Sequence, residues 1–99
     1  MGVLYDNMGK YKQALNYYRQ FLAICKSIGD THGEALAYNC LGVDFQMLGD
    51  LGEEGMYQKA IEAHSKHRDL ADNAGKFIAH VNLGIVFDKM GKTYFKYLS

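Results

Sequence analysis

The stretch "LGVDFQMLGD" at residues 41–50 decides the fold, because two close copies of it occur in the same chain. Residues 1–10 read "MGVLYDNMGK" and residues 83–92 read "LGIVFDKMGK". All three have Met or Leu first, Gly second, an aromatic residue fifth, Met or Leu eighth and Gly ninth. The copies begin at residues 1, 41 and 83, so they are 40 and 42 residues apart. Intervals of this length are typical of structural repeats.

Each copy has the apolar spacing of an α-helix. Its first, fifth and eighth positions are apolar, for example Leu41, Phe45 and Leu48. Steps of four and three residues place these side chains on one face of a helix. Glycine is the residue that most easily takes the left-handed conformation that stops a helix. We therefore expect the three helices to end at Gly9, Gly49 and Gly91.

A further glycine lies inside each of the second and third predicted helices. Glycine in a helix interior costs about 1 kcal/mol relative to alanine. We therefore expect a second helix to approach closely at Gly42 and Gly84, because only such a contact would compensate that cost.

Residues 11–28 and 57–74 have the pattern of this second helix, since packing positions of the first segment recur 46 residues later. These positions are Tyr11, Ala14, Leu15, Tyr18 and Cys25, and then Tyr57, Ala60, Ile61, His64 and Ala71. Both segments then reach a glycine, which predicts helix ends at Gly29 and Gly75. The small side chains of Ala14 and Ala60 are expected to meet the glycine-bearing helix.

The pattern thus has two parts. A large apolar residue, a glycine and an aromatic residue lie in one helix, and an alanine and a residue with a ring side chain lie in the next helix. This order is met by Met1, Gly2, Tyr5, Ala14 and Tyr18, and again by Leu41, Gly42, Phe45, Ala60 and His64. On these residues the chain resembles the tetratricopeptide repeat family. The connection "SIGDTHGEALAYNCLG" at residues 27–42 is similar to the longer variant, of about 40 residues, in kinesin light chains and Leu-Gly-Asn repeat proteins. The resemblance implies an all-α fold of antiparallel helix pairs stacked as an α-solenoid.

The chain is expected to divide into three units. Residues 1–29 are a helix pair with a truncated first helix, residues 31–75 a second pair with an extended turn at 50–56, and residues 76–99 a first helix with an incomplete tail. The extended turn can be a loop or a continuation of the preceding helix. Terminal repeats normally carry a polar cap, and neither end has one. We therefore expect a piece of a longer array, or a chain that buries its ends against a copy of itself.

Composition argues against several classes of partner. Lys+Arg and Asp+Glu both number 11, so the formal net charge is 0 and no overall field attracts nucleic acid or an anionic membrane. No apolar run approaches the roughly 18 residues of a membrane span, and the first ten residues lack the apolar region of a signal peptide. The two cysteines, Cys25 and Cys40, suit a reducing compartment. These features predict a cytoplasmic protein.

The polar residues that suggest chemistry are better explained by packing. A metal site is conceivable around His64 and His67, with further ligands from Cys40, Glu53 and Glu54. The tight spacings of zinc sites are missing, however, and His64 takes the position of Tyr18. Cys25 aligns with Ala71, which predicts an inert core thiol. We predict no metal, no cofactor and no enzymatic activity.

The tail "DKMGKTYFKYLS" at residues 88–99 interleaves lysines with aromatic residues, as in proteins that bind single-stranded RNA. The neutral net charge favours a second interpretation, in which the aromatic residues cover the end of the core and the lysines remain solvated. We expect no nucleic-acid partner.

The resemblance also implies a binding surface, since stacked helix pairs leave their first helices along a concave groove. In this family the groove receives an extended peptide or a helix of a partner protein. The corresponding positions are Val3, Asp6, Asn7, Asn39, Val43, Gln46, Val81, Ile85, Asp88 and Lys89. The resemblance therefore implies a scaffold or adaptor segment. The alternative is a structural segment that forms homo-oligomers through its exposed ends.

Overall fold

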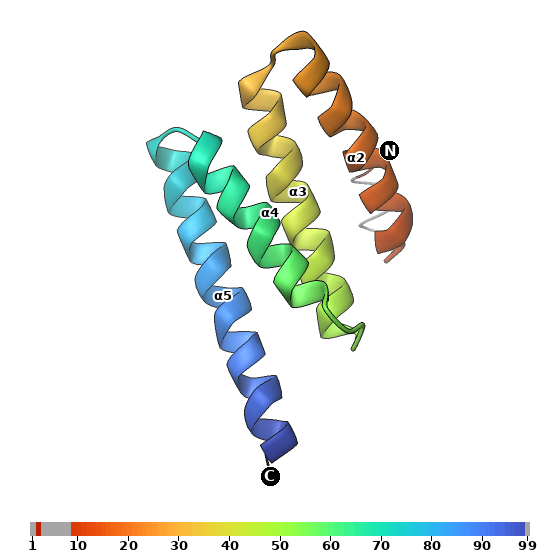
Figure 1. Ribbon diagram of the computed structural model, residues 1–99, viewed down its shortest axis with the longest axis vertical. Helices are drawn as coiled ribbons and strands as arrows, with labels where there is room; N and C mark the ends of the chain where they lie inside the picture. Colours follow the sequence, from red (N-terminus) through yellow and green to blue (C-terminus); the bar gives the residue numbers. More distant parts are fainter. Residues whose placement is uncertain (1, 3–8, 99) are drawn as a thin grey trace.

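The computed structural model describes Gly2 and residues 9–98, with side chains up to residue 93, and this part of the chain contains four α-helices and no strand. The helices are α2 (Tyr11–Ile28), α3 (Thr31–Asp50), α4 (Met56–Leu70) and α5 (Asn73–Leu98). Each helix runs antiparallel to the preceding one and packs against it (Figure 1). This arrangement confirms the predicted all-α fold of packed antiparallel helices.

Two aspartates start helices in the same way. The Asp30 carboxylate accepts a hydrogen bond of 2.9 Å from the backbone N–H of Gly33, and the Asp72 carboxylate accepts one of 2.9 Å from that of Gly75. Such caps satisfy a backbone donor that has no partner within the helix. Gly75 therefore belongs to the first turn of α5, and the prediction that it ends the preceding helix is wrong. That helix, α4, ends at Leu70 because Ala71 is extended, with φ −81° and ψ 158°.

Glycines with positive φ mark only some of the predicted helix ends. Gly29, with φ 72°, ends α2 as predicted. In the second unit α3 continues past Gly49 to Asp50, and the left-handed residues are Gly52 and Gly55, with φ 92° and 77°. The predicted helix end at Gly49 is therefore wrong, and residues 51–55 form a loop. The end predicted at Gly91 is also wrong, because α5 continues through it to Leu98.

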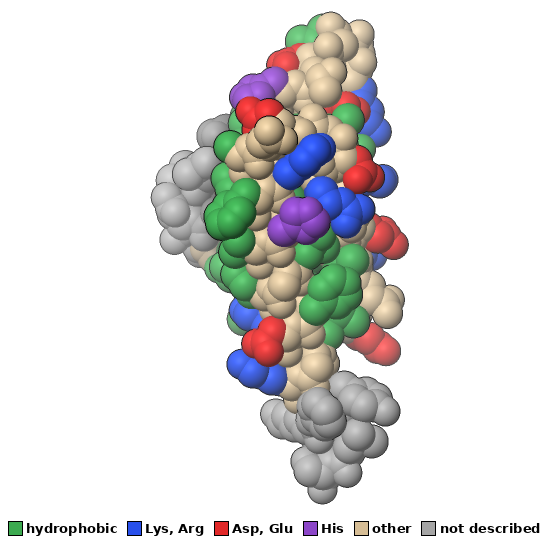
Figure 2. Space-filling model, turned by 90° about the vertical axis from the view of Figure 1, so that its left-hand side faces the viewer, with side chains coloured by type: hydrophobic (Ala, Val, Ile, Leu, Met, Phe, Trp, Pro, Cys, Tyr) green, Lys and Arg blue, Asp and Glu red, His purple; other side chains and the backbone are tan. Residues whose placement is uncertain are grey.

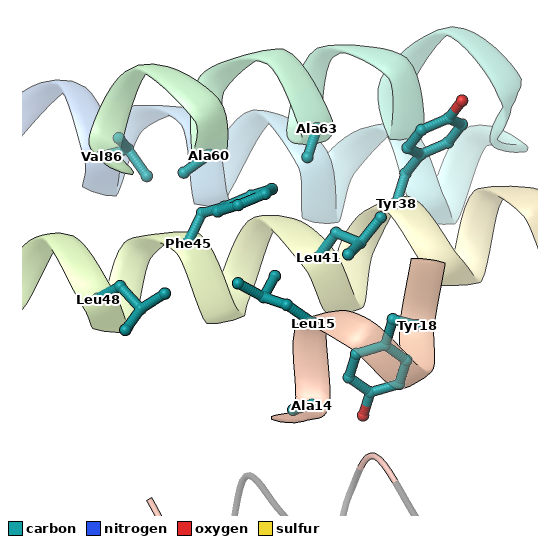
Figure 3. Packing of buried hydrophobic residues seen from close by; sticks show 10 residues of the cluster. All are labelled: Ala14, Leu15, Tyr18, Tyr38, Leu41, Phe45, Leu48, Ala60, Ala63 and Val86. Atoms are coloured by element: carbon teal, nitrogen blue, oxygen red, sulfur yellow. The ribbon is translucent and has the colours of Figure 1, made fainter. Parts of the chain in front are cut away.

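The hydrophobic core surrounds α3. Side chains from α2 meet one side of α3 and side chains from α4 and α5 meet another (Figure 3). The buried cluster consists of Ala14, Leu15, Tyr18, Tyr38, Leu41, Phe45, Leu48, Ala60, Ala63 and Val86. The apolar stripe predicted for the second copy is thus the central part of the core.

Two glycines of α3 lie beneath rings of α4. A Cβ added to Gly42 would overlap the imidazole of His64, and one added to Gly49 would lie 2.6 Å from the ring of Tyr57. The close helix contact predicted at Gly42 is therefore confirmed. The side chain that fills it is His64, one helical turn after Ala60, rather than Ala60 itself.

The first and third units differ in this contact. A Cβ added to Gly2 would lie 2.6 Å from the ring of Tyr18, so the first unit has the same glycine–ring arrangement. Gly84, in contrast, is exposed and has no atom of the described residues within 4 Å of its added Cβ. The close contact predicted at Gly84 is wrong, because no helix within the described part of the chain covers that side of α5.

Candidate functional site

The predicted groove residues of α3 and α5 lie on neighbouring surfaces that two polar contacts hold together. The Asn82 side-chain amide donates a hydrogen bond of 3.1 Å to the Asn39 carbonyl oxygen, and Lys89 Nζ lies 2.7 Å from an Asp50 carboxylate oxygen. Because α3 and α5 run in the same direction (Figure 1), these contacts align the two helices along their lengths. We name this surface the α3–α5 face; it consists of Asn39, Val43, Gln46, Asp50, Val81, Asn82, Ile85 and Lys89.

The predicted residues differ in how accessible they are. Three on α3 and one on α5 are half-buried: Asn39, Val43, Gln46 and Lys89. Val81 and Ile85 are 46% and 40% exposed, so they are the accessible apolar positions. Asp88 is exposed and pairs with Lys92 at 3.1 Å, which leaves it a weaker candidate for contact with a partner. Val3, Asp6 and Asn7 lie outside the described residues.

Sequence reasoning missed Asn82 and Asp50. Asn82 aligns with Cys40 in the preceding copy, so the repeat carries no signal for an amide there. The sequence predicts that Asp50 lies in the turn, whereas it is the last residue of α3 and reaches Lys89, which is 39 positions further along the chain. A charge pair of this separation becomes visible only when the register of the two helices is known.

One end of the α3–α5 face opens onto an acidic hollow of about 930 Å³. It is lined by Gly49, Asp50, Gly52, Glu53, Glu54, Gly55, Tyr57 and Thr93. Burial raises the pKa of Asp50, but hydrogen bonds from Lys89 and Tyr57 outweigh it and hold that pKa below its ordinary value. Burial and the adjacent Asp50 carboxylate raise the pKa of Tyr57 to about 12. At neutral pH Asp50 is therefore a carboxylate and Tyr57 a neutral phenol.

The residues considered for chemistry are mostly core residues. His64 is fully buried and His67 is 6% exposed, which confirms the packing role predicted for His64. Cys25 is 2% exposed, and burial, with Asp30 and Glu34 nearby, raises the pKa of its thiol. A raised pKa disfavours the nucleophilic thiolate. Within the described residues, no three His, Cys, Asp or Glu side chains are grouped so that they would hold a metal ion.

None of the helices within residues 9–98 has both the length and the apolar content that a membrane-crossing helix needs.

The helices pack antiparallel in chain order, and glycines of one helix lie beneath rings of the following helix. These two features define an all-α helical repeat protein. Residues 1–31 match the family model of the tetratricopeptide repeat. The match supports a repeat of that type in the first unit, whereas the longer repeat variant stays a prediction. No curated protein and no solved structure matches the chain.

Proposed function

We propose that the chain is a protein-interaction module that holds an extended peptide or a helix of a partner protein on the α3–α5 face. The tetratricopeptide match supports a protein-interaction role in general. The observation that carries the proposal is the bonded amide pair Asn39–Asn82, which lies next to the exposed apolar residues Val81 and Ile85.

The amide pair has hydrogen-bonding capacity left for a peptide backbone. An Asn side chain offers two N–H donors and a carbonyl acceptor, and the bond at 3.1 Å uses only one N–H of Asn82 and the oxygen of Asn39. The N–H groups of Asn39 and the oxygen of Asn82 are then suited to a backbone without regard to its sequence. Ile85 and Val81 add apolar contact. Glu54, an acidic residue of the hollow that forms no ion pair within the described residues, favours a basic residue at one end of the peptide.

Substitution of Ile85 by Asp is expected to weaken peptide binding at least tenfold, because it places a charge where an apolar anchor would be buried. The ligand is selected from a displayed library of random peptides on the wild-type chain. Its affinity for each variant is then measured by fluorescence anisotropy. Asn39→Ala is expected to reduce affinity through loss of the amide donors.

The matched control is Ile24→Asp, since Ile24 is 58% exposed on α2, away from this face. It should leave the affinity unchanged. Equal losses in Ile24→Asp and Ile85→Asp, or no selectable peptide, would contradict the proposal. Thermal unfolding of each variant checks that the helices remain packed.

A second candidate function, self-association, is supported by the uncovered side of α5. Phe77 and Phe87 are 71% and 57% exposed there, on either side of Gly84 (hydrophobic side chains of this face are green in Figure 2). The equivalent residues 42 positions earlier are Ala35, Gly42 and Phe45, and all three are buried. The side of α5 that corresponds to the α4-covered side of α3 is thus open to solvent.

The sequence of α5 fits an antiparallel pairing with α5 of a second copy. In an antiparallel pair of helices, the numbers of facing residues have a constant sum, which defines the register. Within the chain, Gly42 lies beneath His64 and Gly49 beneath Tyr57, so this sum is 106 for both pairs. In an antiparallel pair of two α5 helices, one register would place Phe87 over Gly84 and His80 over Gly91, because the residue numbers of both pairs sum to 171. Two-fold symmetry would generate each contact twice.

The variant Phe87→Asp tests this pairing. We expect the wild-type mass from light scattering to rise from one chain toward two with concentration. The variant should stay at one chain, because a carboxylate would replace the ring above Gly84. A wild-type mass of one chain at the highest concentration would rule out the pairing.

A further inference from the structure

A second hollow, separate from the α3–α5 face, lies between α2 and α4 and has an aromatic floor supplied by α3. Its volume is about 290 Å³, and its lining residues are Arg19, Leu22, Tyr38, Leu41, Phe45, Lys59, Glu62, Ala63 and Lys66. The floor residues point from α3 toward α4 (Figure 3). We name this hollow the cationic cleft.

Basic side chains from α2 and α4 flank the aromatic floor in two layers. The Arg19 guanidinium and Lys59 ammonium groups lie 5.7 Å and 5.9 Å from the centre of the Phe45 ring. The ammonium groups of Lys26 and Lys66 lie 5.7 Å and 5.5 Å from the centre of the Tyr38 ring. Each ring thus has one cation from each flanking helix, at the distance of a cation–π contact.

The layers repeat every seven residues on all three helices. Arg19 and Lys26, Phe45 and Tyr38, and Lys59 and Lys66 are each seven positions apart. Seven residues of α-helix span about 10 Å. Three residues of a polyproline II chain span about 9 Å, and because that chain has three residues per turn, every third side chain points the same way.

The four cations have charge available for a ligand. None of them forms an ion pair within the described part of the chain, whereas Lys12, Lys89 and Lys92 do. Among the residues that line the cleft, Arg19, Lys59 and Lys66 are basic and Glu62 is acidic. Lys26 lies beside the lining, against the Tyr38 ring, and Glu34 acts on it. The cleft therefore carries more positive than negative groups, although the whole chain has a formal net charge of 0.

We propose that the cationic cleft binds an acidic segment of a protein in the polyproline II conformation, with a carboxylate at every third residue and an apolar side chain between them. The carboxylates would meet the cations of the two layers, and the apolar side chain would meet Leu22, the half-buried apolar residue of α2 that lines the cleft. Nucleic acid fits less well, because bases stack on open ring faces. Tyr38 and Phe45 are only 7% and 8% exposed.

The test uses three labelled synthetic peptides of equal length: repeated Glu-Leu-Ser, repeated Gln-Leu-Ser and repeated Glu-Ser-Ser. We expect Glu-Leu-Ser to bind most tightly in fluorescence anisotropy and to weaken as salt is raised. The double variant Arg19→Gln/Lys59→Gln should weaken it about tenfold. The control Lys10→Gln/Lys92→Gln removes the same charge elsewhere and should have little effect.

Each other outcome overturns the proposal. Equal binding of Glu-Leu-Ser and Glu-Ser-Ser would indicate a polyanion attracted by charge alone, and tighter binding of single-stranded oligo-thymidine would indicate nucleic acid. Equal losses of affinity in the two double variants would mean that the peptide does not bind in the cationic cleft. The variant Ile85→Asp should retain Glu-Leu-Ser binding, so failure here and failure of the α3–α5 face are distinguishable.

Discussion

Replacing Gly42 with alanine is expected to lower the free energy of unfolding by about 2 kcal/mol. The added Cβ would lie 2.6 Å from both ring nitrogens of His64, closer than atoms in a folded core approach. His64 is fully buried, so its ring has no solvent to move into. Overpacking of this kind costs up to about 3 kcal/mol, and the better helix propensity of alanine offsets about 1 kcal/mol.

The matched control is Gly84→Ala, in the equivalent position of α5. No atom of the described residues lies within 4 Å of its added Cβ, so in the single chain only helix propensity changes and stability should rise by up to about 1 kcal/mol. Urea unfolding followed by circular dichroism at 222 nm measures both variants. If Gly42→Ala proved as stable as the wild type, the glycine–ring contact would not constrain the packing of α3 on α4.

This pair of glycines shows which features of the structure the repeat pattern predicts and which it does not. Position nine of the three copies is always glycine, yet Gly9 has φ 72°, and Gly49 is helical beneath Tyr57. Gly91 is helical, and no atom of the described residues lies within 4 Å of its added Cβ. The local sequence is nearly the same in each case. The difference comes from the helix that covers the residue, and that helix is set by turn length and by distant residues.

The proposed binding surface was predictable to a similar extent. Val43 and Ile85 follow from their place in the repeat, and both lie on the α3–α5 face. The contacts Asn82–Asn39 and Lys89–Asp50 join residues 43 and 39 positions apart, which are not equivalent in the repeat. The cationic cleft was missed for a related reason, since its cations are seven residues apart on two helices whose register is not visible in the sequence.

The stability of the protein is expected to fall by about 3 kcal/mol between pH 7 and pH 4 through His64 alone. Burial, and then the nearby His67, lower the pKa of His64 from 6.5 to about 4. The unfolded chain therefore binds a proton as the pH falls through 6.5, whereas the folded chain binds it only near 4. Stability decreases where the unfolded state holds more protons, and 2.5 pKa units correspond to about 3 kcal/mol.

The variant His64→Phe isolates this effect. It keeps a ring above Gly42, and the equivalent ring in the first unit, Tyr18, also lies on a glycine. The free energy of unfolding from urea titrations at pH 7, 6, 5 and 4.5 should vary less in this variant. His67 adds a smaller loss in the same direction, because burial lowers its pKa and Asp72 opposes that shift only in part. The control His32→Gln, at an exposed site in the first turn of α3, should keep the wild-type slope. A wild-type slope in His64→Phe would mean that the acid sensitivity arises elsewhere in the chain.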